Sequence, residues 1–418
     1  MMGWIRGFNF AVLALLSLSY FYQIVYVFVR WFSRTKEFGA AKPGRYAVVI
    51  SARNESAVIG ELLESVRKQD YPQELLDVYV VADNCTDNTA QVARNHRAVV
   101  FERFDRTQVG KGYALNYLFA QIETMTGIEA YDGYLVLDAD NVLDENYMKE
   151  MNKVFAEGYP VVTSYRNSKN YGSNWISAGY ALWFLRESKY LNGARMQCKT
   201  SCAISGTGFL MSSKIVRANN GWKHHLLTED IEFSVDNAIR GEVIGYCEKA
   251  VLYDEQPVNF RESWHQRMRW TKGFYQVFGK YGGELIRSAI KEHCFSSYDM
   301  LMTVAPATLL TLLTLLGNGM FALAGILVGR PAWTGATLAA MGGNFFGIYL
   351  SLFFFGLVTT VSEWRQIHCG TGKKLFYMFT FPVFIFTYIP IAVAALFQRV
   401  TWVPIHHTIV KSVSQIRG

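Results

Sequence analysis

The chain has 418 residues, of which 51% are hydrophobic and 18% charged, and its formal net charge is +7. This length exceeds what one hydrophobic core usually supports, so we expect a globular domain together with further segments. The basic residues are dispersed or stand beside apolar stretches. This distribution favours anionic lipid headgroups over nucleic acid as their partner.

The first segment is an apolar stretch over residues 8–29, which is long enough to cross a membrane as a helix. A cleaved signal peptide is the alternative, but the stretch is longer than a signal-peptide core and no small-residue cleavage site follows it. Residues 1–40 are therefore predicted to be an uncleaved anchor. More basic residues follow the stretch than precede it, which predicts a cytosolic domain after the anchor. They are Arg30, Arg34 and Lys36 after it and Arg6 before it.

The next part of the chain, residues 41–260, is predicted to be an α/β domain. Short apolar runs alternate there with amphipathic helical patterns, which is typical of a largely parallel sheet. The expected strands are 46–50, 78–82, 98–101, 134–137 and 209–212, and the expected helices lie near 58–69, 88–95 and 111–125. Ligands of such sheets bind beyond the carboxyl ends of the strands.

Two polar loops follow the first two expected strands, at residues 51–55 and 82–87. A carboxylate such as Asp83 can accept hydrogen bonds from a nucleobase edge or a ribose. Lys111 stands between two glycines at the start of a helix, where it can reach phosphate oxygens. The alternatives are helix caps for the loops and a solvated lysine for Lys111.

Two carboxylates, Asp138 and Asp140, end the expected strand 134–137. Hard oxygen ligands favour Mg²⁺ or Mn²⁺, and such a metal would hold a diphosphate and neutralise its charge. A polar turn capped by aspartates is the alternative.

Two later motifs also carry chemical groups. Thr228-Glu229-Asp230 introduces a helix, and a carboxylate there can act as a general base toward an acceptor hydroxyl. Capping by Thr228 with acids in the first turn is the alternative. The sequence 266–270 combines an indole with an arginine, suited to a sugar ring and a diphosphate or, alternatively, to an interfacial belt.

The last part of the chain is predicted to lie at or in the membrane. Residues 261–298 mix aromatic and cationic side chains, as interfacial helices do. In residues 299–418, the apolar stretches 301–328 and 331–362 predict an antiparallel helical hairpin. The stretch 375–397 contains Pro382 and Pro390 and has basic residues on both sides, so we expect a re-entrant or interfacial segment rather than a complete crossing.

Taken together and in order, these motifs resemble the family 2 membrane glycosyltransferases, which include cellulose, chitin, hyaluronan and poly-N-acetylglucosamine synthases. The resemblance runs from about Tyr46 to Trp270. It implies a GT-A-like fold between transmembrane helices, in a multi-pass protein of the plasma membrane. It also implies inverting transfer from a UDP-sugar to a growing polysaccharide, processive because Q-x-x-R-W accompanies polymerisation in this family.

The resemblance assigns roles to individual residues. Those implied for the nucleotide-sugar are Ala52, Arg53, Asn54, Glu55, Asp83, Lys111, Asp138, Ala139, Asp140, Gln266, Arg269 and Trp270. Asp138 and Asp140 would hold Mn²⁺ or Mg²⁺, and Asp230, with Glu229 beside it, would be the catalytic carboxylate. Those implied for the acceptor are Gly206, Thr207, Gly208 and Trp270.

Two other functions fit the same motifs. A non-processive transferase would add one sugar to a glycolipid or polyprenyl phosphate, and its donor site would look identical. A non-catalytic membrane binding protein or transporter is the alternative of another class. The expected partners are a UDP-sugar, a polysaccharide or lipid acceptor, the bilayer, and a second copy of the chain or a secretion protein.

Overall fold

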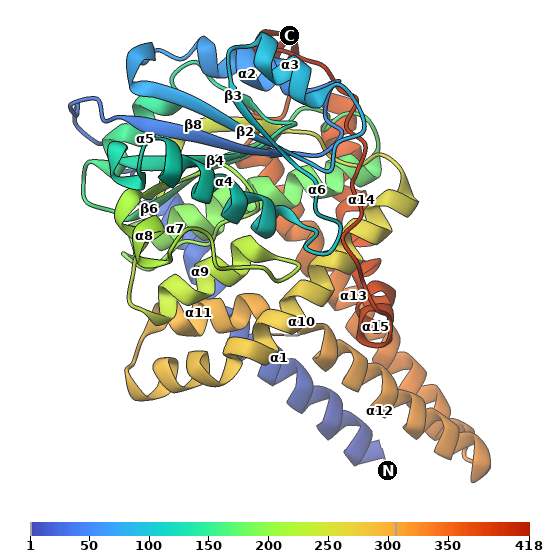
Figure 1. The fold of residues 1–418 in the computed structure, drawn as a ribbon. Helices are drawn as coiled ribbons and strands as arrows, with labels where there is room; N and C mark the ends of the chain where they lie inside the picture. The colour runs from blue at the N-terminus through green and yellow to red at the C-terminus, as the bar shows by residue number, and fades with distance from the viewer. Residues whose placement is uncertain (1, 306) are drawn as a thin grey trace.

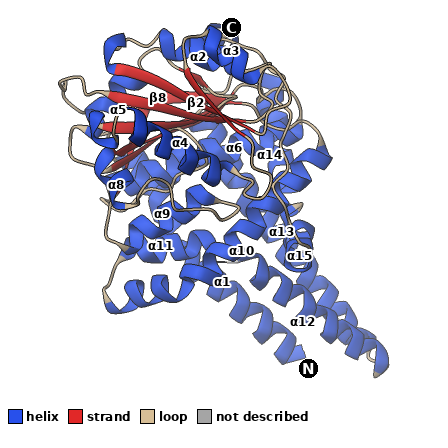
Figure 2. Ribbon diagram, viewed as in Figure 1, coloured by secondary structure: helices blue, strands red, loops and turns tan. Residues whose placement is uncertain are grey.

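The computed structural model describes residues 2–305 and 307–418. An α/β domain stands above a group of long helices, and the N-terminus lies at the far end of this group (Figure 1). A single mixed sheet forms the centre of the domain, with helices on both of its faces (Figure 2). The predicted α/β domain with apolar helices at both ends of the chain is thus confirmed.

The first half of the sheet is parallel, as predicted. It is built from β1 (Tyr46–Ala52), β2 (Leu76–Asp83), β3 (Val99–Arg103) and β4 (Gly133–Asp138), in the order β3-β2-β1-β4. β1 and β4 are almost wholly buried, which explains their continuous apolar runs. The strands run further at their carboxyl ends than predicted, so Asp83 and Asp138 are their last residues.

The second half of the sheet is mixed. Its strands are β5 (Val142–Leu143), β6 (Val161–Ser168), β7 (Phe209–Ser212) and β8 (Ile244–Asp254). β7 is antiparallel to β4 and β6, whereas β6 and β8 are parallel, and the order across the whole sheet is β3-β2-β1-β4-β7-β6-β8-β5. β1, β2, β4, β6 and β8 consequently all end at one edge.

The helices of the domain connect these strands. They are α2 (Ile59–Arg67), α3 (Thr89–Asn95), α4 (Lys111–Met125), α5 (Tyr147–Phe155), α6 (Trp175–Arg186), α7 (Gly193–Gln197), α8 (Ser213–Ala218) and α9 (Glu229–Ile239). α2, α3 and α4 match the three predicted helices. α6 begins at a capping box, in which Asn174 accepts the backbone N–H groups of Ile176 and Ser177.

Seven further helices include the long apolar ones. They are α1 (Met2–Phe32), α10 (Phe260–Lys291), α11 (Phe295–Val304), α12 (Ala307–Leu327), α13 (Pro331–Ser362), α14 (Thr371–Phe386) and α15 (Tyr388–Phe397). Within the described residues, three helical segments are long and apolar enough to cross a membrane: Gly3–Phe32, Pro331–Ser362 and Thr371–Phe397.

One expected apolar stretch is not a single helix. Residues 301–304 of the stretch 301–328 belong to α11, and the helix that follows, α12, begins at Ala307. α12 and α13 form the predicted hairpin, in which Thr334 Oγ donates to the Ala322 carbonyl at 3.3 Å.

The last apolar segment is interrupted between α14 and α15, where α14 ends at Phe386. Pro390 has no N–H to donate to the Phe386 carbonyl, and its ring clashes with that carbonyl in a regular helix, so the interruption falls one turn before this proline. Pro382 lies inside α14. The expected re-entrant course of this segment stays a prediction, because its length also suits a crossing.

Buried polar contacts join α1 to the rest of the molecule. Arg30 pairs with Glu248 of β8 at 2.7 Å, and Tyr26 donates to Asp299 of α11 at 2.8 Å. Asp299 also forms a fully buried ion pair with Arg195 of α7. Toward the far end, the side chains of Asn9, Asn318 and Asn344 hydrogen-bond α1 to α12 and α13.

The C-terminal tail returns to the α/β domain. After α15 the chain runs up the side of the molecule to a short helix, α16 (Val413–Arg417), and ends beside α2 and α3 (Figure 1). Arg417 Nε donates to the Tyr253 hydroxyl at 3.0 Å. The tail therefore crosses the edge at which the parallel strands end.

Candidate active site

A cavity of about 980 Å³ begins where the parallel strands end and continues between α1, α12 and α13. The sequence-predicted residues that line it come from seven separate segments. They are Ala52, Arg53, Glu55, Asp83, Lys111, Asp138, Ala139, Asp140, Gly206, Glu229, Asp230, Gln266, Arg269 and Trp270. Asn54, Thr207 and Gly208 do not line it. The structure thus brings nearly all the predicted site residues to one place.

Asp83, at the end of β2, is held by a buried arginine. Arg103 Nη1 lies 2.6 Å from Asp83 Oδ1, and Arg103 Nη2 donates to the Gln108 carbonyl at 2.9 Å. The salt bridge fixes the Asp83 carboxylate at the cavity wall. Sequence reasoning missed Arg103, because it ends an unremarkable strand.

Lys111 begins α4 and points into the cavity. Its Nζ lies 2.5 Å from Asp138 Oδ1 and 2.6 Å from the Gly206 carbonyl oxygen. Burial lowers the pKa of Lys111, but the nearby Asp138 and Glu229 carboxylates outweigh this effect and hold its pKa above the usual value. Lys111 is therefore a cation at neutral pH.

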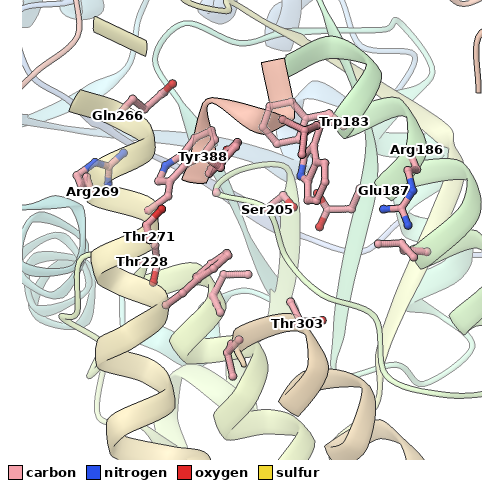
Figure 3. A pocket seen from close by; sticks show the side chains of 18 of the residues that line it. Trp183, Arg186, Glu187, Ser205, Thr228, Gln266, Arg269, Thr271, Thr303 and Tyr388 are labelled. Carbon is pink, nitrogen blue, oxygen red and sulfur yellow. The ribbon is translucent and has the colours of Figure 1, made fainter. Parts of the chain in front are cut away.

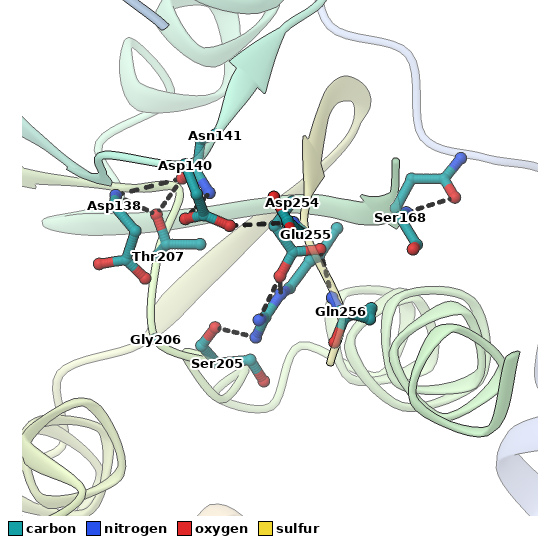
Figure 4. A network of polar contacts seen from close by, with 12 residues as sticks. Asp138, Asp140, Asn141, Ser168, Ser205, Gly206, Thr207, Asp254, Glu255 and Gln256 are labelled. Carbon is teal, nitrogen blue, oxygen red and sulfur yellow. Dashed lines mark hydrogen bonds and ion pairs between the residues drawn. The ribbon is translucent and has the colours of Figure 1, made fainter. Parts of the chain in front are cut away.

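Hydrogen bonds fix the turn after β4, which carries the two aspartates (Figure 4). Asp140 Oδ2 accepts the Glu255 N–H at 2.9 Å. Thr207 Oγ accepts the Asp138 N–H at 2.9 Å and donates to Asn141 Oδ1 at 2.5 Å. Thr207 thus supports the turn that carries Asp138 and Asp140, and only Gly206 of the loop 206–208 reaches the cavity.

Gly208 is required for packing rather than for ligand contact. Its φ is +68°, and an added Cβ would lie 2.0 Å from Leu252 Cδ2 and 2.5 Å from Ser164 Oγ. Any larger residue would displace β8 or the loop.

The donor set around Asp138 and Asp140 fits part of a divalent-cation site. Carboxylate oxygens suit Mg²⁺ and Mn²⁺, which usually keep waters and substrate phosphates as further ligands. Among the described residues, no group of three His, Cys, Asp or Glu side chains is arranged to hold a metal. A metal here would therefore take its remaining ligands from waters or from a bound diphosphate.

The two carboxylates at the start of α9 face the same space. A Cβ added to Gly206 would lie 3.9 Å from Asp138 Oδ2 and 4.0 Å from Asp230 Oδ2, so both groups flank this glycine. Burial raises the pKa of Asp230. Burial and the neighbouring Asp230 charge raise the pKa of Glu229 to about 7.

Thr228 occupies the N-cap position of α9, but its side chain makes no capping hydrogen bond. It packs instead against α10, where a Cβ on Gly273 would lie 2.5 Å from Thr228 Oγ. The alternative that the Thr228 side chain caps this helix is therefore wrong.

The residues of Q-x-x-R-W lie on α10, along one wall of the cavity (Figure 3). Arg269 Nη1 donates to the Leu227 carbonyl at 3.1 Å, which places the guanidinium beside the loop before α9. The Trp270 ring packs edge-on against Tyr180, with centroids 5.6 Å apart. Gln266 Oε1 is buried without a hydrogen-bond partner among the described residues, so it is available to a ligand.

The end of β8 supplies groups that sequence reasoning missed. Asp254 Oδ2 accepts Arg166 Nε at 2.7 Å, and Arg166 Nη1 donates to the Ser205 carbonyl at 2.7 Å. Burial raises the pKa of Asp254 to about 6, although Arg166 opposes this. An apolar run ending in Asp254-Glu255 repeats the pattern of β4, and this signal was present in the sequence.

The C-terminal tail supplies a further part of the site. His407 Nδ1 lies 2.9 Å from Glu55 Oε1, and the Arg53 guanidinium lies 5.0 Å from the centroid of the Trp402 ring. Glu255 accepts the backbone N–H groups of Thr408 and Ile409. The tail thereby covers the cavity near Asp140, and the adjacent histidines 406–407 were the only local signal for it.

The chain is similar to known glycosyltransferases in sequence and in fold. The protein-family model described as "Glycosyltransferase like family 2" matches residues 43–273. A β-monoglucosyldiacylglycerol synthase from Synechocystis is 25% identical over 56% of this chain and 48% of its own length. A poly-β-1,6-N-acetyl-D-glucosamine synthase from Staphylococcus epidermidis is 25% identical over 55% of this chain and 54% of its own.

The chain thus spans about half the length of these two relatives. Among solved structures, a mannosyltransferase from Pyrobaculum calidifontis, in complex with GDP-Man and Mn²⁺, superimposes with a TM-score of 0.57. The match covers 93% of this chain and 99% of the mannosyltransferase at 17% identity. Together with the family match, this likeness confirms the predicted GT-A-like fold.

Proposed function

This chain belongs to the glycosyltransferase-like family 2, and from that premise we propose that it transfers a sugar from a UDP-sugar, with inversion, to an acceptor held at the membrane. The observation that carries the proposal is the shared cavity. Asp83, the Asp138–Asp140 turn, Asp230 and the Q-x-x-R-W residues line it together, although they are distant in sequence.

Asp230 is the proposed general base. It would take the proton of the acceptor oxygen while that oxygen forms a bond to the anomeric carbon of the sugar. The bond between this carbon and the diphosphate breaks, and UDP leaves with the electron pair. No covalent sugar–protein intermediate is needed, so an α-linked donor would give a β-linked product.

The other charged groups would position the donor. Lys111, Arg269 and Asp83 line the cavity. The two cations would supply positive charge to the diphosphate, and Asp83 would accept a hydrogen bond from the nucleoside. Mn²⁺ or Mg²⁺, held by Asp138 and Asp140, would supply Lewis-acid stabilisation of the leaving diphosphate when bound.

The location and the product are part of the proposal. Basic residues after α1 support a cytosolic active site in a multi-pass protein of the plasma membrane. Q-x-x-R-W favours a processive polysaccharide synthase. Such a synthase would act as a homo-oligomer or together with a secretion partner. The apolar continuation of the cavity favours the second candidate, a glycolipid synthase.

The test uses the full chain in nanodiscs with a panel of UDP-sugars and Mn²⁺, following UDP release and product size. Asp230→Asn should lower transfer at least about 100-fold while nucleotide binding stays within about twofold. The matched control is Glu242→Gln at an exposed glutamate. Full turnover by Asp230→Asn would disprove the assignment of the base, and a high polymer would identify a synthase.

A further inference from the structure

The lower part of the cavity lies between α1, α12 and α13. On α1 its lining includes Leu13, Leu16, Tyr20 and Ile24, which recur at helical spacing on one face. From α13 it includes Phe345, Ile348, Leu352 and Phe355, again on one face. Apolar side chains therefore dominate this part of the cavity, in contrast to the acidic upper part.

The dimensions of this apolar part suit a lipid chain. Its lining on α1 extends from Ile24 down to Asn9, which corresponds to about 22 Å at 1.5 Å per residue. A hydrocarbon core is roughly 30 Å thick, so this length exceeds one leaflet. A polar glycan would lose its hydrogen bonds to water along such a wall, whereas an alkyl or isoprenoid chain would not.

Arg186 lies where the apolar part meets the catalytic part. It is 8% exposed, and its Nη2 donates to Gln23 Oε1 of α1 at 2.6 Å. The guanidinium carbon lies 4.9 Å from the centroid of the Phe355 ring of α13. Arg186 thus joins two candidate membrane spans near the ends that meet the α/β domain.

The guanidinium of Arg186 has no salt-bridge partner within residues 2–305 and 307–418. Four other buried or nearly buried arginines each pair with a carboxylate; they are Arg30, Arg103, Arg166 and Arg195. Arg267, which also lacks a carboxylate, donates to Ser263, Phe384 and Thr387 instead. The adjacent Glu187 carboxylate acts on Arg186 electrostatically but forms no salt bridge with it. A buried guanidinium without a salt bridge is costly, so Arg186 is suited to an anionic ligand.

The position of Arg186 connects it with the reacting groups. Trp183, Arg186 and Glu187 form the wall opposite α10, and Ser205 lies between the two walls (Figure 3). Glu187, Ser205 and Gly206 line the same cavity as Asp230. A ligand anchored at Arg186 can therefore extend toward the base without leaving the cavity.

We propose that the cavity binds a lipid phosphate, with the chain between α1 and α13 and the phosphate on Arg186, and that this lipid presents the acceptor oxygen to the anomeric carbon of the donor. A headgroup hydroxyl would give its proton to Asp230, whereas the anionic oxygen of a phosphate monoester would attack without a base. The acceptor role rests on the proposed glycosyltransferase function, whereas the binding role does not. A phospholipid headgroup and a polyprenyl phosphate share this chemistry. A neutral lipid lacks it.

The experiment measures lipid binding by the full chain in detergent micelles containing phosphatidylglycerol, a polyprenyl phosphate or diacylglycerol. Arg186→Gln should weaken binding of the two phosphate lipids about 10-fold or more, because a charge-assisted contact is lost, and leave diacylglycerol unchanged. Leu352→Trp should weaken all three by filling the chain path. Arg217→Gln, at an exposed ion pair with Glu129, is the matched control and should change nothing.

A second readout tests the acceptor role in the same samples. Labelled sugar should appear on the phosphate lipid that serves as acceptor. Its identity distinguishes a phospholipid such as phosphatidylglycerol from a polyprenyl phosphate. Equal binding of phosphate lipids by Arg186→Gln and by the wild type, or equal transfer to diacylglycerol, would overturn the proposal. If Arg186→Gln does not fold, Arg186→Lys, which keeps the charge, should retain binding while Leu352→Trp loses it. Lipid binding without UDP release from any donor would count against the proposed function but not against the lipid site.

Discussion

Lys111 Nζ lies 2.5 Å from Asp138 Oδ1, so a cation from α4 already contacts a carboxylate that is proposed to bind a metal. A divalent cation would compete with Lys111 for this oxygen. The same lysine is also proposed to contact the donor diphosphate. Lys111 should therefore weaken the binding of the metal and strengthen the binding of the donor.

Lys111→Gln should therefore strengthen metal binding and weaken donor binding. We expect the Mn²⁺ concentration for half-maximal activity to fall, because the competing charge is gone, while the KM for the UDP-sugar rises about 10-fold. Metal and donor titrations of the purified chain measure both constants. If both ligands bound more weakly by the same factor, the competition at Asp138 would be refuted.

Glu229 and Asp230 provide a test based on pH. Asp230 acts as a base only when it is deprotonated, so its raised pKa should cause activity to fall at a pH above the usual range for aspartate. Glu229→Gln removes the adjacent carboxylate, which makes ionisation of Asp230 easier. The acidic limb of the pH profile of kcat/KM should then move to lower pH, with activity near neutral pH retained. A loss of more than about 100-fold at all pH values would instead identify Glu229 as the base.

The buried Arg195–Asp299 pair should be important for stability. Asp299→Asn leaves the Arg195 guanidinium buried without its counter-ion, which costs about 3–5 kcal/mol. Thermal unfolding in detergent should show a clear decrease in the midpoint temperature. Asp70→Asn removes an exposed pair with Lys149 and should cost less than about 1 kcal/mol, so comparable losses in the two variants would contradict this account.

The sequence predicted those parts of the site that follow buried parallel strands. Asp83 and Asp138 stand directly after continuous apolar runs, and parallel strands bring such positions to one edge. β6 was missed, because its residues Val161–Ser168 include several polar side chains although the strand is almost wholly buried. The Arg166–Asp254 pair depends on the pairing of β6 with β8, which no local pattern records.

The tail could not be assigned to the site for the same reason. Glu55 and His407 are 352 positions apart, and their contact depends on the course of the chain after α15. Hydropathy likewise does not reveal where a helix begins or ends. The first four residues of the apolar stretch 301–328 belong to α11, and Val304 at the end of that helix is buried.

His407 gives the final prediction, which concerns donor binding. Burial favours the neutral imidazole, but the Asp140 and Glu55 carboxylates outweigh it and raise the pKa of His407 to about 10. The charged imidazole therefore lies beside the proposed diphosphate site at neutral pH, where it reduces repulsion between the acidic groups and the donor.

His407→Gln should raise the KM for the UDP-sugar severalfold and change kcat less, because the charge acts on binding rather than on proton removal. Initial rates over a range of donor concentrations measure both constants. Lys411→Gln, at an exposed residue of the same tail, is the matched control for a general loss of positive charge. An equal rise in KM for the two variants would mean that the tail acts through its net charge, and no rise in either would place His407 outside the donor site.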